Sequence, residues 1–128
     1  MVGRYQLKTH VDFSAAHLLR GYDGPCARLH GHNYRLEVEV EATRLDEIGL
    51  AVDFSEIRSA ARAHIADFDH RHLNEIPPFD QLNPTAENVA AVLFRRLAAT
   101  LNSDRVRVAA VTLSESERSS VRYTEDRR

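Results

Sequence analysis

The strongest constraint on the fold is a strict alternation of apolar and charged residues in the segment YRLEVEVEA, residues 34–42. Every second side chain is apolar, and the side chains between them are charged. This period of two is typical of a strand with one buried and one polar face. We therefore predict a strand over residues 31–43, with Glu37, Glu39 and Glu41 on its polar face.

Three further segments are predicted to be strands. Residues 4–13 alternate in the same way, and residues 105–114 and 119–124 flank a short polar turn, which predicts a hairpin. Residues 18–29 contain two glycines and a proline and are predicted to form a loop. Four strands leave two sheet edges, and such edges are usually paired or covered, so we expect a homo-oligomer.

Two helices are predicted between the second and third strands. Asp53, followed by Glu56 three residues later, is typical of a helix N-terminus with a capping box. Thr85 is a suitable N-cap for a second helix. The order ββααββ predicts an α+β fold, with an antiparallel four-stranded sheet and both helices on one face.

The bulk properties limit the class of protein. A chain of 128 residues suits a single domain, 1–128, and one cysteine excludes an internal disulfide. A net charge of −2 without a basic block argues against nucleic acid as the main partner. The sequence contains no apolar run long enough for a membrane span and no signal peptide, so we expect a cytoplasmic protein.

Three histidines are candidate metal ligands. His30 and His32 are two residues apart, so they point to the same side of a strand. His17 lies at the end of FSAAH, and pairing of the first two strands would bring it alongside them. Three neutral imidazoles suit zinc and leave a fourth position open, as in catalytic zinc sites. The alternative is that these are loop histidines with ordinary hydrogen bonds.

Cys26 has three possible roles. A lone cysteine is most often a buried small hydrophobic residue, but Gly24 and Pro25 place this one in a loop. It is then either a fourth zinc ligand, which would close the site and make it structural, or a nucleophile or base beside an open zinc. Residue spacing does not separate these two roles.

Acidic residues supply the remaining candidates. Asp69 beside His70 is either a polar helix end or an oriented pair that acts with a thiol, as in a Cys-His-Asp triad. Glu115 lies at the end of an alternating run, whereas Glu117 falls in the turn. A carboxylate such as Glu115 can accept two parallel N–H bonds from a guanidine-like edge of a ligand.

Six motifs occur in order along the chain: FSAAH, C-x-x-x-HGHNY, VDF, DH-x-x-LN, NPTAENVA and SES. Together they resemble the 6-pyruvoyl-tetrahydropterin synthase family. The three-residue gap between Cys26 and His30 is similar to that of the bacterial 6-carboxy-tetrahydropterin synthases of the queuosine pathway.

This resemblance implies a tunnelling fold, in which ββααββ subunits form trimeric barrels that stack into hexamers. It implies a substrate, 7,8-dihydroneopterin triphosphate, and in the carboxy branch the products 6-carboxy-tetrahydropterin, acetaldehyde and triphosphate. The implied residues are the zinc ligands His17, His30 and His32, the catalytic triad Cys26, Asp69 and His70, the pterin anchor Glu115, and further pterin contacts at Thr85 and Glu87.

Two alternatives remain open at this point. The first alternative, within the family, is a 6-pyruvoyl-tetrahydropterin synthase, which eliminates triphosphate and retains the carbon side chain. The second, outside the family, is a non-catalytic zinc-binding module with a closed site of one cysteine and three histidines. A related branch that cleaves the side chain lacks the cysteine, so Cys26 argues against it.

Overall fold

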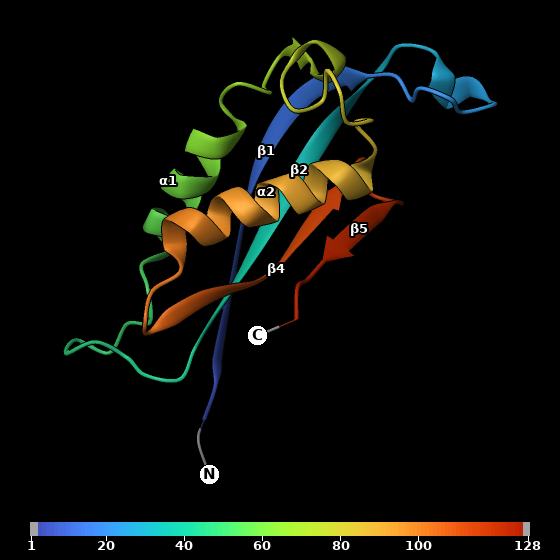
Figure 1. Cartoon of the computed structure of the whole chain (residues 1–128). Helices are drawn as coiled ribbons and strands as arrows, with labels where there is room; N and C mark the ends of the chain where they lie inside the picture. Colours follow the sequence, from blue (N-terminus) through green and yellow to red (C-terminus); the bar gives the residue numbers. More distant parts are fainter. Residues whose placement is uncertain (1–2, 127–128) are drawn as a thin grey trace.

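A twisted sheet of five strands forms the centre of the computed structural model, which describes residues 3–126 (Figure 1). The strand order is β3-β1-β2-β4-β5. All neighbouring strands are antiparallel except β1 and β3, which run parallel. The strands are β1 (Tyr5–His17), β2 (His30–Ala42), β3 (Arg71–His72), β4 (Val106–Ser114) and β5 (Ser120–Tyr123). The predicted α+β class is confirmed, but the sheet has a fifth strand.

Strands β1 and β2 pair along their whole length of 13 residues each, with Tyr5 opposite Ala42 and His17 opposite His30. β1 extends four residues beyond the predicted 4–13, because its inward alternation continues through Ala15 to His17. The short strand β3 was not predicted, since two residues carry no periodicity. β3 forms because its chain lies beside Ala15 and Ala16 on the outer edge of β1.

Helices α1 (Phe54–Ile65) and α2 (Ala86–Leu101) both cover one face of the sheet (Figure 1). The predicted N-caps are confirmed. The Asp53 carboxylate accepts the backbone N–H of Ser55 at 2.8 Å, and the Thr85 hydroxyl accepts that of Asn88 at 3.1 Å. These bonds satisfy donors that a helix leaves free in its first turn. The apolar faces of both helices then pack on the inward side chains of β1, β2 and β4.

A bulge in β4 changes which side chains face the helices. The register with β2 shifts between Glu39 and Val40, so one extra residue lies in β4. Val106 and Val108 are buried before the shift, and Val111 and Leu113 after it. An extra residue reverses the alternation of everything that follows in a strand. The bulge therefore decides which way the end of β4 points.

The polar face of β2 is more buried than its charges suggest. Glu39 and Glu41 are only 5% and 7% exposed. The Arg122 guanidinium donates to both carboxylate oxygens of Glu39 at 3.0 and 3.1 Å, which lowers the pKa of that carboxyl. Glu41 forms ion pairs with Arg4 at 3.1 Å and Arg107 at 3.3 Å. Neighbouring arginines therefore cover these glutamates.

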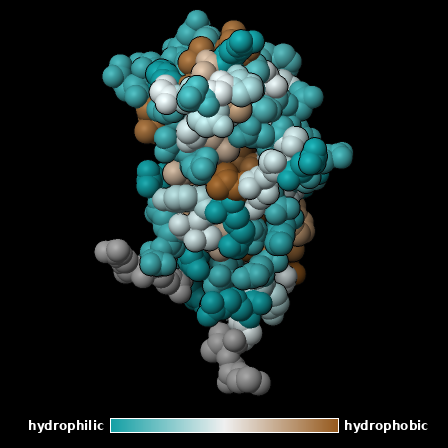
Figure 2. Space-filling view, turned by 90° about the vertical axis from the view of Figure 1, so that its right-hand side faces the viewer, coloured by the Kyte–Doolittle hydropathy of each residue, from teal (hydrophilic) through white to brown (hydrophobic). Residues whose placement is uncertain are grey.

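The side of the molecule on which β5 forms the sheet edge is mainly hydrophilic, with a small apolar area near its middle (Figure 2). Neither described helix combines the length and the apolar character that crossing a membrane would require.

Candidate metal and substrate site

Three histidines occupy the end of the hydrophobic face that the helices cover. On β1 the inward series Val11, Phe13 and Ala15 ends in His17, which is 1% exposed. On β2 the same face ends in His32 and His30. Because the register sets His17 opposite His30, the three imidazoles meet at one end of the core. The predicted clustering is therefore confirmed, and the same alternation that builds the core produces it.

The ring nitrogens of these histidines are arranged to accept a metal ion. One nitrogen from each ring lies within 4.8 Å of the other two, and the ring centroids of His17 and His30 are 4.6 Å apart. The Nδ1 atom of His17 lies 2.7 Å from the carbonyl oxygen of Pro84, and that of His30 lies 2.7 Å from the oxygen of Arg28. A carbonyl only accepts, so Nδ1 carries the proton and Nε2 keeps its lone pair.

Burial supports the same interpretation. The Nε2 atom of His17 is buried and has no hydrogen-bond partner within residues 3–126. Desolvation by burial also lowers the pKa of His17, which favours the neutral imidazole that metals require. A buried nitrogen without a partner is costly unless a ligand satisfies it. The residues present therefore fit a zinc ion.

Glu115 lies beside this cluster. Its Oε2 atom is 2.8 Å from Nε2 of His32, although the two atoms lack the alignment of a hydrogen bond. β2 and β4 pair Arg35 with Ser114, so one further step along the same register would set Glu115 opposite Tyr34. The bulge in β4 makes this possible, because it reverses the alternation before Glu115. Residue spacing suggested Glu115 as a candidate but did not predict its contact with a histidine.

Asp69 and His70 line the same pocket as His32 and Glu115, which measures about 940 Å³. The Oδ1 atom of Asp69 lies 2.9 Å from Nδ1 of His70 and also accepts the backbone N–H of Ser14 at 3.0 Å. His70 has a left-handed backbone, with φ of 60°, and its N–H donates to the carbonyl of Ser14. Uncommon backbone conformations of this kind cluster at functional sites.

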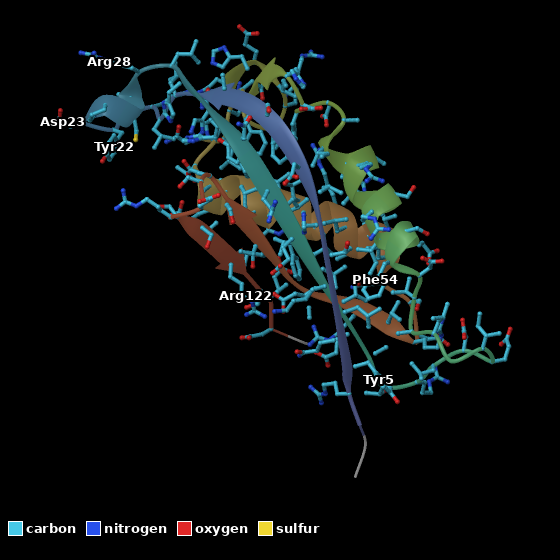
Figure 3. All side chains as sticks on the ribbon, turned by 180° about the vertical axis from the view of Figure 1, so that it is seen from behind. Tyr5, Tyr22, Asp23, Arg28, Phe54 and Arg122 are labelled. Carbon is cyan, nitrogen blue, oxygen red and sulfur yellow. The ribbon has the colours of Figure 1, made fainter. Side chains whose placement is uncertain are left out.

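Cys26 lies outside this pocket. It belongs to the 3₁₀ turn η1 (Pro25–Ala27), and its carbonyl accepts the N–H of Leu19 at 2.9 Å. The segment that carries it extends away from the sheet, near the labelled Tyr22 and Arg28 (Figure 3). Cys26 is partly buried and does not line the pocket that holds Asp69 and His70. In the described part of the chain, the cluster of possible metal ligands contains the three histidines and no cysteine.

Comparison with known proteins identifies the family. The family model described as 6-pyruvoyl tetrahydropterin synthase matches residues 6–126. The chain belongs to the 6-pyruvoyl tetrahydropterin synthase family. The predicted family is thus confirmed, and the motifs that suggested it lie within the matched residues.

Several curated relatives are similar to this chain over most of its length. The 6-carboxy-5,6,7,8-tetrahydropterin synthase of Rickettsia typhi is 33% identical over 112 residues, which cover 74% of this chain and 81% of the relative. That of Bacillus subtilis is 32% identical over 104 residues, covering 77% and 69%. A protein of Archaeoglobus fulgidus that carries the same name provisionally is 40% identical over 101 residues, covering 77% and 82%.

Solved structures of the family share the fold. The 6-pyruvoyl tetrahydropterin synthase of Caenorhabditis elegans superposes with a TM-score of 0.85 at 24% identity, and the alignment covers 98% of both chains. This likeness over almost the whole chain confirms the predicted tunnelling fold.

The two further contacts that the family resemblance implied lie at the start of α2. The Thr85 hydroxyl serves as the helix N-cap, and Glu87 is exposed in the first turn. Neither residue lines the pocket of Glu115. Thr85 follows Pro84, whose carbonyl orients His17, so this segment is joined to the histidine cluster. The roles of Thr85 and Glu87 in pterin binding stay predictions.

Two asparagines of the family motifs have a positioning role that residue spacing missed. The Asn74 side chain accepts the N–H of Leu18 and donates to its carbonyl, both at 3.0 Å. The Asn83 side chain forms the same pair of bonds with Arg20, at 2.9 and 3.1 Å. Each side-chain amide thus forms the pair of hydrogen bonds that the backbone of a neighbouring strand would form. The two asparagines therefore extend the edge of β1 beyond His17 and hold the start of the segment that carries Cys26.

Proposed function

We propose that this chain is a zinc-dependent 6-carboxy-5,6,7,8-tetrahydropterin synthase that acts in the cytoplasm on 7,8-dihydroneopterin triphosphate. The observation that carries the proposal is a cluster of three histidines able to hold a metal ion, of which His32 also lines the pocket that contains Glu115 and the Asp69–His70 pair. The names of the curated relatives support the carboxy branch. The product would serve as a precursor in queuosine biosynthesis, as the resemblance implies.

Each residue in the site has a chemical role in this proposal. His17, His30 and His32 would hold zinc, which supplies a Lewis acid that increases the acidity of C–H bonds next to the substrate's side-chain oxygens. Glu115 would accept the two parallel N–H groups of the pterin ring, which fixes the ring's orientation. The overall conversion consumes one water and releases acetaldehyde and triphosphate.

Proton transfer would be carried out by the remaining three residues, Asp69, His70 and Cys26. Oδ1 of Asp69 lies 2.9 Å from Nδ1 of His70 and would hold the proton on that nitrogen, which would leave Nε2 of His70 to take or give a proton. Cys26, as a thiolate, would remove the proton from the activated carbon. This role requires the segment of Cys26 to approach the pocket, either by movement or from a neighbouring subunit.

The non-catalytic alternative requires a closed site with sulfur as the fourth ligand. The cluster of three histidines without Cys26, in the residues described, supports the open site. The carboxylate of Glu115 beside His32 further supports a site that binds a substrate.

Product analysis tests the proposed activity. The purified protein, incubated with 7,8-dihydroneopterin triphosphate, is expected to yield 6-carboxy-tetrahydropterin and acetaldehyde, detected by mass spectrometry. Formation of 6-pyruvoyl-tetrahydropterin without acetaldehyde would favour the other branch. If a zinc-loaded protein yielded neither product, the catalytic proposal would be wrong.

We also propose that the chain forms homohexamers, as a dimer of trimers. Within residues 3–126, β3 pairs with β1 only at Ala15 and Ala16, so the outer edge of β1 from Tyr5 to Phe13 has no partner strand. At the opposite edge, β5 is also free on one side. Pairing of these two edges between copies would satisfy their backbone groups. Light scattering is expected to give six times the mass of one chain, and a monomer at micromolar concentration would contradict the proposal.

A further inference from the structure

The pocket that contains Glu115 adjoins a second pocket of about 490 Å³. Three segments line the second pocket: residues 14–16 of β1, residues 31–33 of β2, and residues 70–72, which include β3. The two pockets share a wall, to which both His32 and His70 belong. A long ligand can therefore extend from one pocket into the other past the histidines.

The two pockets differ in charge. Four carboxylates line the first: Asp12, Asp69, Glu115 and Glu117. Its one guanidinium, Arg35, is paired with Asp12 at 3.2 Å. None of the residues that line the second pocket is acidic, and Arg71 is the only lysine or arginine among them. The first pocket therefore favours groups that donate hydrogen bonds, and the second favours anions.

Arg71 combines a fixed backbone with a free side chain. Its backbone pairs with Ala15 in the parallel β1–β3 ladder, and its N–H donates to the carbonyl of Phe68 at 3.2 Å. The side chain is exposed and has no hydrogen bond or ion pair within residues 3–126. A guanidinium with no protein partner can form two parallel bonds with phosphate oxygens.

We propose that the second pocket is the subsite for the triphosphate group of the substrate, with Arg71 as its main charged contact. This inference rests on the proposed function, which supplies a substrate with a pterin ring at one end and a triphosphate at the other. The ring lies against Glu115 in the first pocket, and the carbon side chain passes His32 and His70. The triphosphate then enters the second pocket, because four carboxylates repel it from the first.

Two oxidised pterins test the subsite directly. Neopterin triphosphate and neopterin differ only in the triphosphate group, and the fluorescence of the ring reports binding of both without turnover. Arg71→Gln is expected to weaken binding of neopterin triphosphate by about 10- to 100-fold and to leave neopterin binding unchanged. Arg71→Lys should recover part of the loss, since it restores the charge but not the paired bonds.

Three comparisons make the result specific. Arg62→Gln, at an exposed arginine of α1, should bind both ligands as the unmodified protein does. Glu115→Gln should weaken both ligands equally, because both carry the ring. If Arg71→Gln weakened binding of both ligands equally, or of neither, the proposed triphosphate subsite would be contradicted. The proposed pterin site at Glu115 would not be affected by that result. If the unmodified protein bound neither pterin, both the proposed function and the subsite would be overturned.

Discussion

His30→Ala is expected to abolish stoichiometric zinc binding and to lower kcat/KM by about 10³-fold or more, the scale on which charge-stabilising groups act in catalysis. The ring of His30 lies 4.6 Å from that of His17 and 4.9 Å from that of His32, centroid to centroid. Its removal leaves two imidazoles, which is fewer than the three protein ligands of a catalytic zinc site. Elemental analysis of the purified protein and steady-state kinetics measure the two effects.

His10→Ala is the matched control for this change. His10 is an exposed histidine of β1, where it pairs with Glu37 and lies away from the cluster. This variant should retain one zinc per chain and full activity. Zinc content that stays the same in His30→Ala would show that the metal, if present, is held elsewhere. Loss of zinc in both variants would indicate that replacing either histidine disturbs the folded structure, so the loss could not be assigned to a missing ligand.

Cys26→Ala should retain zinc and the folded structure and lose turnover by about 10²- to 10⁴-fold, the usual contribution of a general base. The expectation of retained zinc follows from the cluster of ligands, which comprises His17, His30 and His32 in the described chain and does not include Cys26. The expectation of lost turnover follows from the proposed role of the thiolate. Zinc analysis, circular dichroism and product formation together measure the outcome.

The two roles of Cys26 predict opposite results for zinc. If Cys26→Ala lost its metal as His30→Ala does, a closed structural site would replace the catalytic one. If the variant kept both zinc and turnover, another residue would have to remove the proton. Alkylation of the unmodified protein with iodoacetamide offers a second measurement, because Cys26 is the only cysteine in the chain. Alkylation should inactivate the enzyme without releasing zinc.

The main elements and the cluster of three histidines were predictable because each follows from a local pattern. The alternation of β2 places His30 and His32 on one face whatever the rest of the chain does. The caps at Asp53 and Thr85 are local hydrogen bonds, so their residue types sufficed. The candidate pair Asp69–His70 came from adjacency in sequence, and its role came from the family resemblance.

Other features depend on partners that are distant in sequence. The burial of Glu39 depends on Arg122, which is 83 residues away along the chain. The strand β3 exists only because residues 71–72 lie against the edge of β1. No periodicity marks either feature, since each is decided by which segments the fold brings side by side. The same is true of Asn74 and Asn83, whose amides bind the backbone near His17.

By itself, the sequence determined the order of the four longer strands and the two helices and the strand face that carries the histidines, because periods of 2 and 3.6 residues and helix caps act within a few residues. Only the tertiary structure decided how the pocket that contains Glu115 and His70 is assembled. The bulge in β4 turns Glu115 toward His32, and the hydrogen bonds to Ser14 bring Asp69 and His70 to the same pocket. These contacts depend on a bulge and on hydrogen bonds between segments that are distant in sequence, neither of which an alternation of apolar residues marks.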